Sequence, residues 1–198
     1  MEENKMIYLD YAAATPVDKE VLLRYMEVTT KYFANPNANH KLGQDAAKLI
    51  SESTKKIASY LGVEPEEIIY TSGASESNNL AIKGISERYK NFGRHILISS
   101  LEHNSVVSSA TRLQEQGFEV EVVPVNQEGL IDLNSLKSLL REDTILVSIC
   151  TVDSEIGLKQ PIEEIGEILK NYPHCHFHTD ATQAIGKIPV HLENVDLL

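Results

Sequence analysis

Cysteine is scarce in this sequence, because Cys150 and Cys175 are the only two among 198 residues. Both lie in apolar surroundings typical of strands, and their spacing fits neither a disulfide framework nor a Cys-x-x-Cys motif. Nothing in this pattern indicates a disulfide-stabilised secreted domain. We therefore expect a protein of a reducing, cytoplasmic environment.

Positive charge and long apolar runs are also scarce. The chain has 18 Lys and Arg residues against 29 Asp and Glu, and its formal net charge is -11. Nucleic-acid binding needs clusters of basic side chains that neutralise phosphates, and the sequence has no such cluster. No apolar run approaches the length that crosses a bilayer, and residues 1–5 lack the basic and apolar regions of an export signal. We expect neither a nucleic-acid partner nor insertion into a membrane.

Hydrophobic residues make up 42% of the chain, which is enough to bury a substantial core. Strands are expected at residues 68–70, 96–98, 120–125, 144–149 and 175–179. Helices are expected from about Asp18 to before Asn35, at 42–61 with Gly62 after the end, from the turn at 73–75, at 106–113, at 133–140 after the cap Asp132, and at 162–169. Because right-handed crossovers bring successive strands in parallel, this alternation predicts the α/β class, with a mostly parallel, doubly wound sheet in three α/β/α layers.

A strand, a tight turn and a helix are expected to follow one another at residues 68–82. The first N–H groups of such a helix have no partner inside it, and the helix dipole places partial positive charge there. Gly73 allows a phosphate to approach the backbone of Ala74 and Ser75, and the Ser72 and Ser75 hydroxyls can add donors. The alternative is an ordinary serine-rich helix cap. Neither a dinucleotide-binding glycine motif nor a P-loop is present.

Doubly wound sheets bind ligands at the carboxyl ends of their strands. Polar residues follow the expected strands at 72–75, 102–103, 153–155 and 180–183. Asp180 could accept a hydrogen bond from a cationic ring nitrogen, cap the following turn, or bind a metal. His103 could be a base, a stacking partner or an ordinary loop histidine, and Gln183 could donate to a ligand or lie on a helix surface.

Three alternating histidines, His174, His176 and His178, would project from one face of a strand. Ligands with this spacing in a single strand splay too far apart for ideal tetrahedral zinc coordination. We therefore expect no metal site here.

Several segments occur together in a characteristic order and spacing. They are residues 8–16, 35–43, 71–79, 102–103, 155–162 and 178–183. Together they resemble the cysteine desulfurases of the NifS/IscS type, which are class V aminotransferase-like enzymes of fold type I that use pyridoxal 5'-phosphate (PLP). The resemblance runs from about Tyr8 to the end of the chain. It implies an N-terminal segment at 1–15 and a PLP-binding large domain at 16–198, incomplete at its carboxyl-terminal end.

The resemblance also implies a set of cofactor-binding residues. These are Gly73, Ala74, Ser75, His103, Ser154, Asp180 and Gln183. The turn that begins at Gly73 would hold the phosphate, and His103 would stack on the pyridine ring and act in catalysis by assisting proton transfer. Asp180 would keep the ring nitrogen protonated so that the ring accepts electron density. Gln183 would bond the ring hydroxyl.

One departure from the family pattern lies at Asp153-Ser154-Glu155, where the family usually has Asn-Asn-Glu. Ser154 stands in place of an amide that touches cofactor and substrate. A hydroxyl reaches less far, and Asp153 would add negative charge if it faced inward. We expect weaker PLP binding or an altered substrate.

The implied reaction transfers sulfur from L-cysteine to an enzyme cysteine, giving a persulfide and alanine. The family's Schiff-base lysine and persulfide cysteine correspond to positions after Leu198, and neither Cys150 nor Cys175 has a matching context. We therefore expect this chain alone to be inactive, and to associate as a homodimer or with a complementing C-terminal half. An iron–sulfur scaffold or another protein would accept the sulfur.

Two alternatives remain open at the level of sequence. The first is a non-catalytic half that binds a partner. The second is another class V PLP enzyme, such as a selenocysteine lyase or an aminotransferase.

Overall fold

The computed structural model describes residues 6–198. The chain divides into two compact units, one that ends at Ile69 and one that comprises Tyr70–Leu198. The boundary expected between residues 15 and 16 stays a prediction.

The first unit is helical. It contains α1 (Lys19–Lys31), α2 (Lys41–Leu61) and the short 3-10 helix η1 (Pro65–Glu67). Asp18 caps α1 by accepting hydrogen bonds from the Glu20 and Val21 amides, at 2.8 and 3.3 Å. Gly62 ends α2 in the left-handed region, at a φ of 72°. Both helices, the start of α1 near Asp18 and the end of α2 at Gly62 confirm the prediction from sequence.

The second unit contains a four-stranded sheet. Its strands are β1 (His95–Ser99), β2 (Glu119–Val123), β3 (Thr144–Ser148) and β4 (His176–His178), in the order β2-β1-β3-β4. All three pairings are parallel, which confirms the predicted parallel sheet. The chain goes from β1 to β2 on one side and then crosses to β3 on the other. The strand order therefore reverses between β1 and β3, and this reversal is where doubly wound sheets bind ligands.

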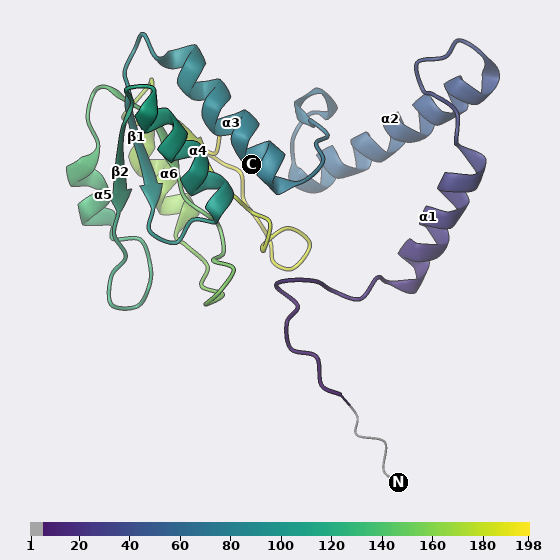
Figure 1. The fold of residues 1–198 in the computed structure, drawn as a ribbon, viewed down its shortest axis with the longest axis horizontal. Helices are drawn as coiled ribbons and strands as arrows, with labels where there is room; N and C mark the ends of the chain where they lie inside the picture. Colours follow the sequence, from purple (N-terminus) through teal and green to yellow (C-terminus); the bar gives the residue numbers. More distant parts are fainter. Residues whose placement is uncertain (1–5) are drawn as a thin grey trace. The chain divides into compact units, whose positions relative to one another are not determined.

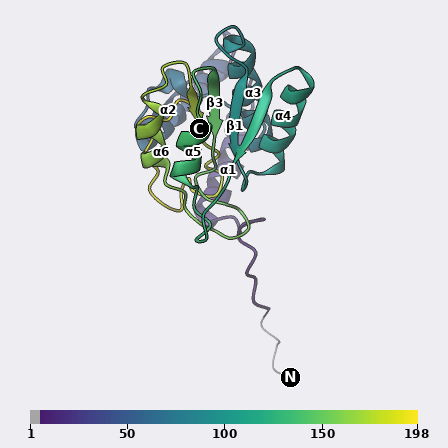
Figure 2. The ribbon, with the colours of Figure 1, turned by 90° about the vertical axis from the view of Figure 1, so that its left-hand side faces the viewer.

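Helices cover both faces of the sheet, with α3 (Ala74–Tyr89) and α4 (Asn104–Glu115) on one face and α5 (Leu133–Leu139) and α6 (Ile162–Leu169) on the other (Figures 1 and 2). Alternate residues of the strands point to opposite faces. Ile96 and Ile98 of β1 pack in the α3 and α4 layer. Leu97 packs in the other layer with Val147, its cross-strand neighbour on β3, and with Phe177, which pairs with Val147 from β4. The α/β/α layering is the predicted one.

The prediction of a strand at residues 68–70 is wrong. These residues lie in an irregular segment immediately before the turn into α3. Ile69 and Tyr70 are 71% and 59% exposed. Apolar residues alone do not make a strand, because a strand also needs a neighbour to complete its hydrogen-bond ladder. In the described chain the sheet contains only β1 to β4.

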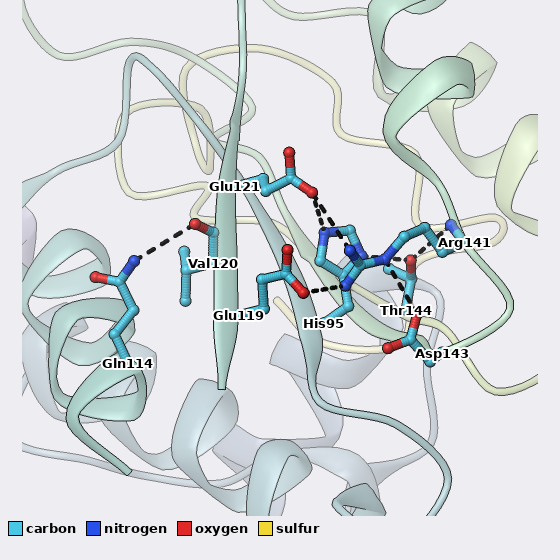
Figure 3. Close-up of polar contacts among 8 residues, drawn as sticks. All are labelled: His95, Gln114, Glu119, Val120, Glu121, Arg141, Asp143 and Thr144. Atoms are coloured by element: carbon cyan, nitrogen blue, oxygen red, sulfur yellow. Dashed lines mark hydrogen bonds and ion pairs between the residues drawn. The ribbon is translucent and has the colours of Figure 1, made fainter. Parts of the chain in front are cut away.

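A buried histidine lies at the amino end of the sheet, opposite the strand ends at which doubly wound sheets bind ligands (Figure 3). His95 Nδ1 lies 2.7 Å from Thr144 Oγ1, and its Nε2 lies 3.1 Å from Glu121 Oε1. Burial and nearby Arg141 lower the pKa of His95, so the ring is neutral at pH 7. Since a carboxylate only accepts, Nε2 carries the proton and Nδ1 accepts from Thr144. These contacts pin the strands where the β1–β3 register shifts between His95 and Ile96.

Phe177 of β4 provides a test of the core. It packs in the core between the sheet and the helices, and only 1% of the residue is exposed. We expect Phe177→Ala to lower the free energy of unfolding by about 3–5 kcal/mol, since the lost ring leaves a cavity. Urea denaturation measures the change. Phe92→Ala is the matched control, because Phe92 is 57% exposed and should cost at most about 1 kcal/mol. Equal losses in the two variants would contradict this account of the core.

Candidate functional site

The candidate site lies within the second unit, where the carboxyl ends of β1, β3 and β4 are joined by hydrogen bonds. The Cys150 amide after β3 donates to Glu102 Oε1 after β1, at 2.7 Å. The Thr151 amide donates to the carbonyl of Asp180 after β4, at 2.9 Å. Polar residues that follow three different strands are thus held next to one another.

The start of α3 has the properties of an anion-binding turn. Gly73, its N-cap, has φ 157° and ψ 176°, a region that residues with a Cβ rarely adopt, and a Cβ there would meet open space. Gly73, Ala74 and Ser75 are all exposed. The Ser72 amide and hydroxyl already donate to the Glu76 carboxylate, at 2.6 and 2.7 Å. These bonds lower the pKa of Glu76, so this turn stabilises negatively charged oxygen.

Asn78, in the second turn of the same helix, joins two parts of the site. Its Nδ2 group donates to Asp180 Oδ2 at 2.8 Å and to Ser105 Oγ at 2.8 Å. The side chain is buried, with 3% of the residue exposed. Both N–H bonds of one amide are therefore used to hold a residue after β4 and a residue in α4.

His103 continues this path as the N-cap of α4. Its Nδ1 lies 2.9 Å from Ser105 Oγ and accepts from the Ser105 amide at 3.2 Å. Because Ser105 Oγ accepts from Asn78, its own hydrogen points to His103 Nδ1. A neutral His103 ring then carries its proton on Nε2. The residue is exposed, so this nitrogen is available to a ligand.

Asp180 is held as an ionised carboxylate. Burial alone would raise its pKa, but hydrogen bonds from Thr182 and Asn78 outweigh burial and lower the pKa below its ordinary value. The Thr182 amide donates to Oδ1 at 2.9 Å, which is the turn-capping bond that the sequence allowed. The same carboxylate therefore caps a turn and faces the Asn78 amide.

The remaining expected site residues lie on two turns. Gln183 Oε1 accepts a hydrogen bond from Lys187 Nζ at 2.6 Å. Ser154 is exposed and makes no hydrogen bond within residues 6–198. Its neighbour Asp153 is buried, and Oδ1 of Asp153 accepts from the Glu155 and Ile156 amides at 3.0 and 2.6 Å. The Asp153 carboxylate therefore organises its own turn.

Asn78 and Ser105 are absent from the residues that the sequence singled out for the site. Ser105 follows His103 by two positions, and it contacts Asn78 only because α3 and α4 pack together. One signal was available: Asn78 shares its helix face with the apolar residues Ile82 and Ile85. An amide on a buried face needs partners, and here those partners are the site residues.

His178, at the end of β4, is a second buried histidine. Its Nδ1 lies 2.8 Å from Ser148 Oγ on β3, and burial lowers its pKa to about 4. Across residues 6–198 no group of three His, Cys, Asp or Glu side chains could hold a metal ion. None of the described helices is long and apolar enough to cross a membrane.

Residues 7–197 match the family described as Aminotransferase class-V. A protein of Methanosarcina thermophila named cysteine desulfurase IscS is 44% identical over 198 residues, which are 99% of this chain and 49% of that protein. The solved structure titled NIFS-LIKE PROTEIN superposes with a TM-score of 0.92 at 37% identity, covering 96% of this chain and 53% of the other. A structure titled SspA in complex with cysteine has a TM-score of 0.90 at 38% identity, with 96% and 55% covered. The chain spans about half the length of such relatives.

The Asn78 amide can be tested by substitution. We expect Asn78→Ala to lower the free energy of unfolding by about 1–3 kcal/mol and to raise the pKa of Asp180, because Asp180 and Ser105 each lose a donor. Urea denaturation and an NMR titration of the Asp180 carboxyl measure the two effects. Asn79→Ala is the matched control, since Asn79 donates only to the Ser75 carbonyl on the exposed side of the helix. An unchanged Asp180 pKa in Asn78→Ala would contradict the assigned hydrogen bonds.

His178 predicts a pH dependence of stability. Its folded pKa of about 4 lies below the ordinary value of 6.5, so the folded state resists protonation that the unfolded state accepts. Stability that His178 provides is present above pH 6.5 and is lost as the pH falls toward 4, by up to about 3 kcal/mol. Between pH 7 and pH 4 we expect the free energy of unfolding of the wild-type protein to fall by about 3 kcal/mol more than that of His178→Asn, as measured by urea denaturation. Parallel stability profiles for the two proteins would refute the prediction.

Proposed function

The chain belongs to the class V aminotransferase family, and from this membership we propose that it supplies the PLP-binding site of a cysteine desulfurase. The resemblance to the NifS/IscS type that the sequence predicts is confirmed by these matches. The proposed reaction takes sulfur from L-cysteine to an enzyme cysteine and leaves alanine. A related structure whose title names bound cysteine supports the choice of substrate.

The residues of the site fit PLP in both charge and order. The N–H groups at Gly73, Ala74 and Ser75 suit a phosphate, and the adjacent Ser72 amide already donates to a carboxylate, that of Glu76. Asn78 lies about 7 Å further along the same helix and holds Asp180, which is ionised and suits a cationic ring nitrogen. The observation that carries the proposal is that one helix begins with an anion-binding turn and, in its second turn, holds the ionised Asp180 through the Asn78 amide.

When bound, PLP supplies an electron-accepting pyridine ring that stabilises negative charge at a carbon that loses a proton. The protein's part is to keep that ring cationic and to handle protons. Asp180 would hold the protonated ring nitrogen, and Asn78 and Thr182 keep Asp180 ionised for this role. His103 would contact the ring and exchange protons at Nε2, because Nδ1 is engaged by Ser105.

Gln183 and Ser154 complete the proposed site. Gln183 would donate from its side-chain amide to the ring hydroxyl while its Oε1 accepts from Lys187. Ser154 is exposed on the turn after β3 and is free to contact the cofactor or the substrate carboxylate. Since a serine hydroxyl reaches less far than an asparagine amide, we expect Ser154 to bind these groups more weakly.

We also propose that the protein works as a homodimer in the cytoplasm and passes sulfur to an iron–sulfur scaffold or another acceptor protein. The α1 helix buries none of its residues within the described chain, and Leu22, Tyr25 and Met26 are 46%, 68% and 57% exposed. Apolar surface of this kind supports association with a partner. The two free cysteines, both buried, support a reducing compartment.

PLP titration tests the proposed site. We expect Asp180→Asn to weaken PLP binding by about 10- to 100-fold, because the ring nitrogen loses its ionic partner. Binding is followed by PLP absorbance and by the ³¹P NMR signal of the phosphate. Asp143→Asn is the matched control, since Asp143 is exposed at the opposite end of the sheet. Equal affinity in wild type and Asp180→Asn would refute the assignment of Asp180.

Because the chain alone is expected to be inactive, the reaction is tested with a complementing C-terminal half and a thiol reductant, by measuring sulfide and alanine released from L-cysteine. Release of both supports the desulfurase. PLP binding without either product favours a non-catalytic half, and alanine without sulfide favours a different class V enzyme.

A further inference from the structure

Glu102 has no role in the site described so far, although it lies next to His103. Its Oε1 accepts a hydrogen bond from Ser99 Oγ at 2.5 Å and from the Cys150 amide at 2.7 Å. Ser99 ends β1, and Cys150, which lies 48 residues after Glu102, comes just after β3. One carboxyl oxygen therefore fastens the loop that carries His103 to the neighbouring strand, at the position where the strand order reverses.

The second oxygen, Glu102 Oε2, is buried and has no hydrogen-bond partner among residues 6–198. The acidic groups that face Glu102 are Asp153 from the turn after β3 and Asp180 from the turn after β4, and the Cys150 thiol lies beside them. Burial raises the pKa of the Cys150 thiol strongly, so the thiol is neutral at pH 7. The surroundings of Glu102 thus contain two carboxylates, and among the described residues no cation lies there to pair with an ionised Glu102.

We propose that Glu102 is a positioning residue that, in its protonated form, locks the His103 loop against the end of β3. In this form Oε1 accepts its two hydrogen bonds and Oε2 carries the proton, so no unpaired charge is buried. Ionisation would place a third negative charge beside Asp153 and Asp180 and would loosen the lock. The consequence for cofactor binding rests on the proposed function, because it assumes that His103 contacts PLP.

The charge state of Glu102 supports this reading. Burial raises the pKa of Glu102 to about 7, with Asp180 and Asp153 adding to the rise and the bonds from Ser99 and Cys150 opposing it. The group therefore changes charge near neutral pH. A carboxyl group whose folded pKa lies above its ordinary value of 4.5 stabilises the fold below pH 4.5, and that stability is lost as the pH rises through 7.

The test uses Glu102→Gln, which keeps an accepting oxygen at Oε1 but cannot ionise, and Glu102→Ala, which removes the lock. Glu128→Gln, at an exposed carboxylate on a loop, is the matched control. The amide NMR signal of Cys150 reports directly on its bond to Glu102, and the amide of Ser105 reports on His103. Both signals are recorded without PLP from pH 5.5 to 8.5, and PLP affinity is measured over the same range.

In wild type and Glu128→Gln we expect the Cys150 amide signal to shift with a midpoint near pH 7. We expect the Ser105 amide signal to shift over the same pH range. Glu102→Gln should show no such midpoint and should keep the low-pH positions throughout. Its melting temperature should exceed that of wild type by more at pH 8.5 than at pH 5.5, with the difference growing by about 5 °C between these two pH values. PLP affinity should fall about threefold or more above pH 7 in wild type and in Glu128→Gln but not in Glu102→Gln, and Glu102→Ala should bind PLP weakly at every pH.

The proposal would be overturned if the Cys150 amide signal still shifted with a midpoint near pH 7 in Glu102→Gln. It would also be overturned if the Ser105 amide signal changed neither with pH nor in Glu102→Ala. These NMR outcomes are decided without cofactor. A protein that binds no PLP would therefore refute the proposed function while the Cys150 midpoint still decides the role of Glu102.

Discussion

The Asn78 side-chain amide is the interaction on which the candidate site depends. It is buried, and its two N–H bonds go to an aspartate after β4 and to a serine in α4. Through the first bond it helps to keep Asp180 ionised in surroundings that would otherwise favour the neutral acid. Through the second it sets the Ser105 hydroxyl, and so decides which nitrogen of His103 carries the proton. A buried amide has few ways to satisfy both bonds, so the residues around it have one arrangement.

The topology of the sheet explains why these residues meet. The order β2-β1-β3-β4 brings the loop after β1 beside the turns after β3 and β4, although they lie far apart in sequence. At the opposite end of the sheet, where the strands begin, other polar groups hold the strands together, chiefly His95 with Thr144 and Glu121. The two ends of the sheet therefore have different roles. One end holds the register of the strands, and the other gathers exposed donors and an ionised carboxylate, which are the groups of the proposed site.

Much of the fold could be predicted from sequence because its signals are local. The periodicity at residues 42–61, the cap at Asp18 and the glycine at 62 depend only on neighbouring residues, and the structure has all three. The apolar run at 68–70 had the same local signal for a strand, but it lies outside the sheet with Tyr70 exposed. Local pattern identifies residues that suit a strand, and whether a partner strand pairs with them is decided elsewhere in the chain.

The sequence alone specifies the class of fold, the family, and the residue types of the candidate site, among them Gly73, His103 and Asp180. How those residues act on one another follows only from the packed structure. The bond from Asn78 to Asp180 joins residues 102 positions apart. The raised pKa of Glu102 and the lowered pKa of His178 likewise follow from burial and from nearby groups. Spacing along a chain sets which side of a helix or strand a residue occupies, whereas distance and dielectric surroundings exist only once the elements have packed.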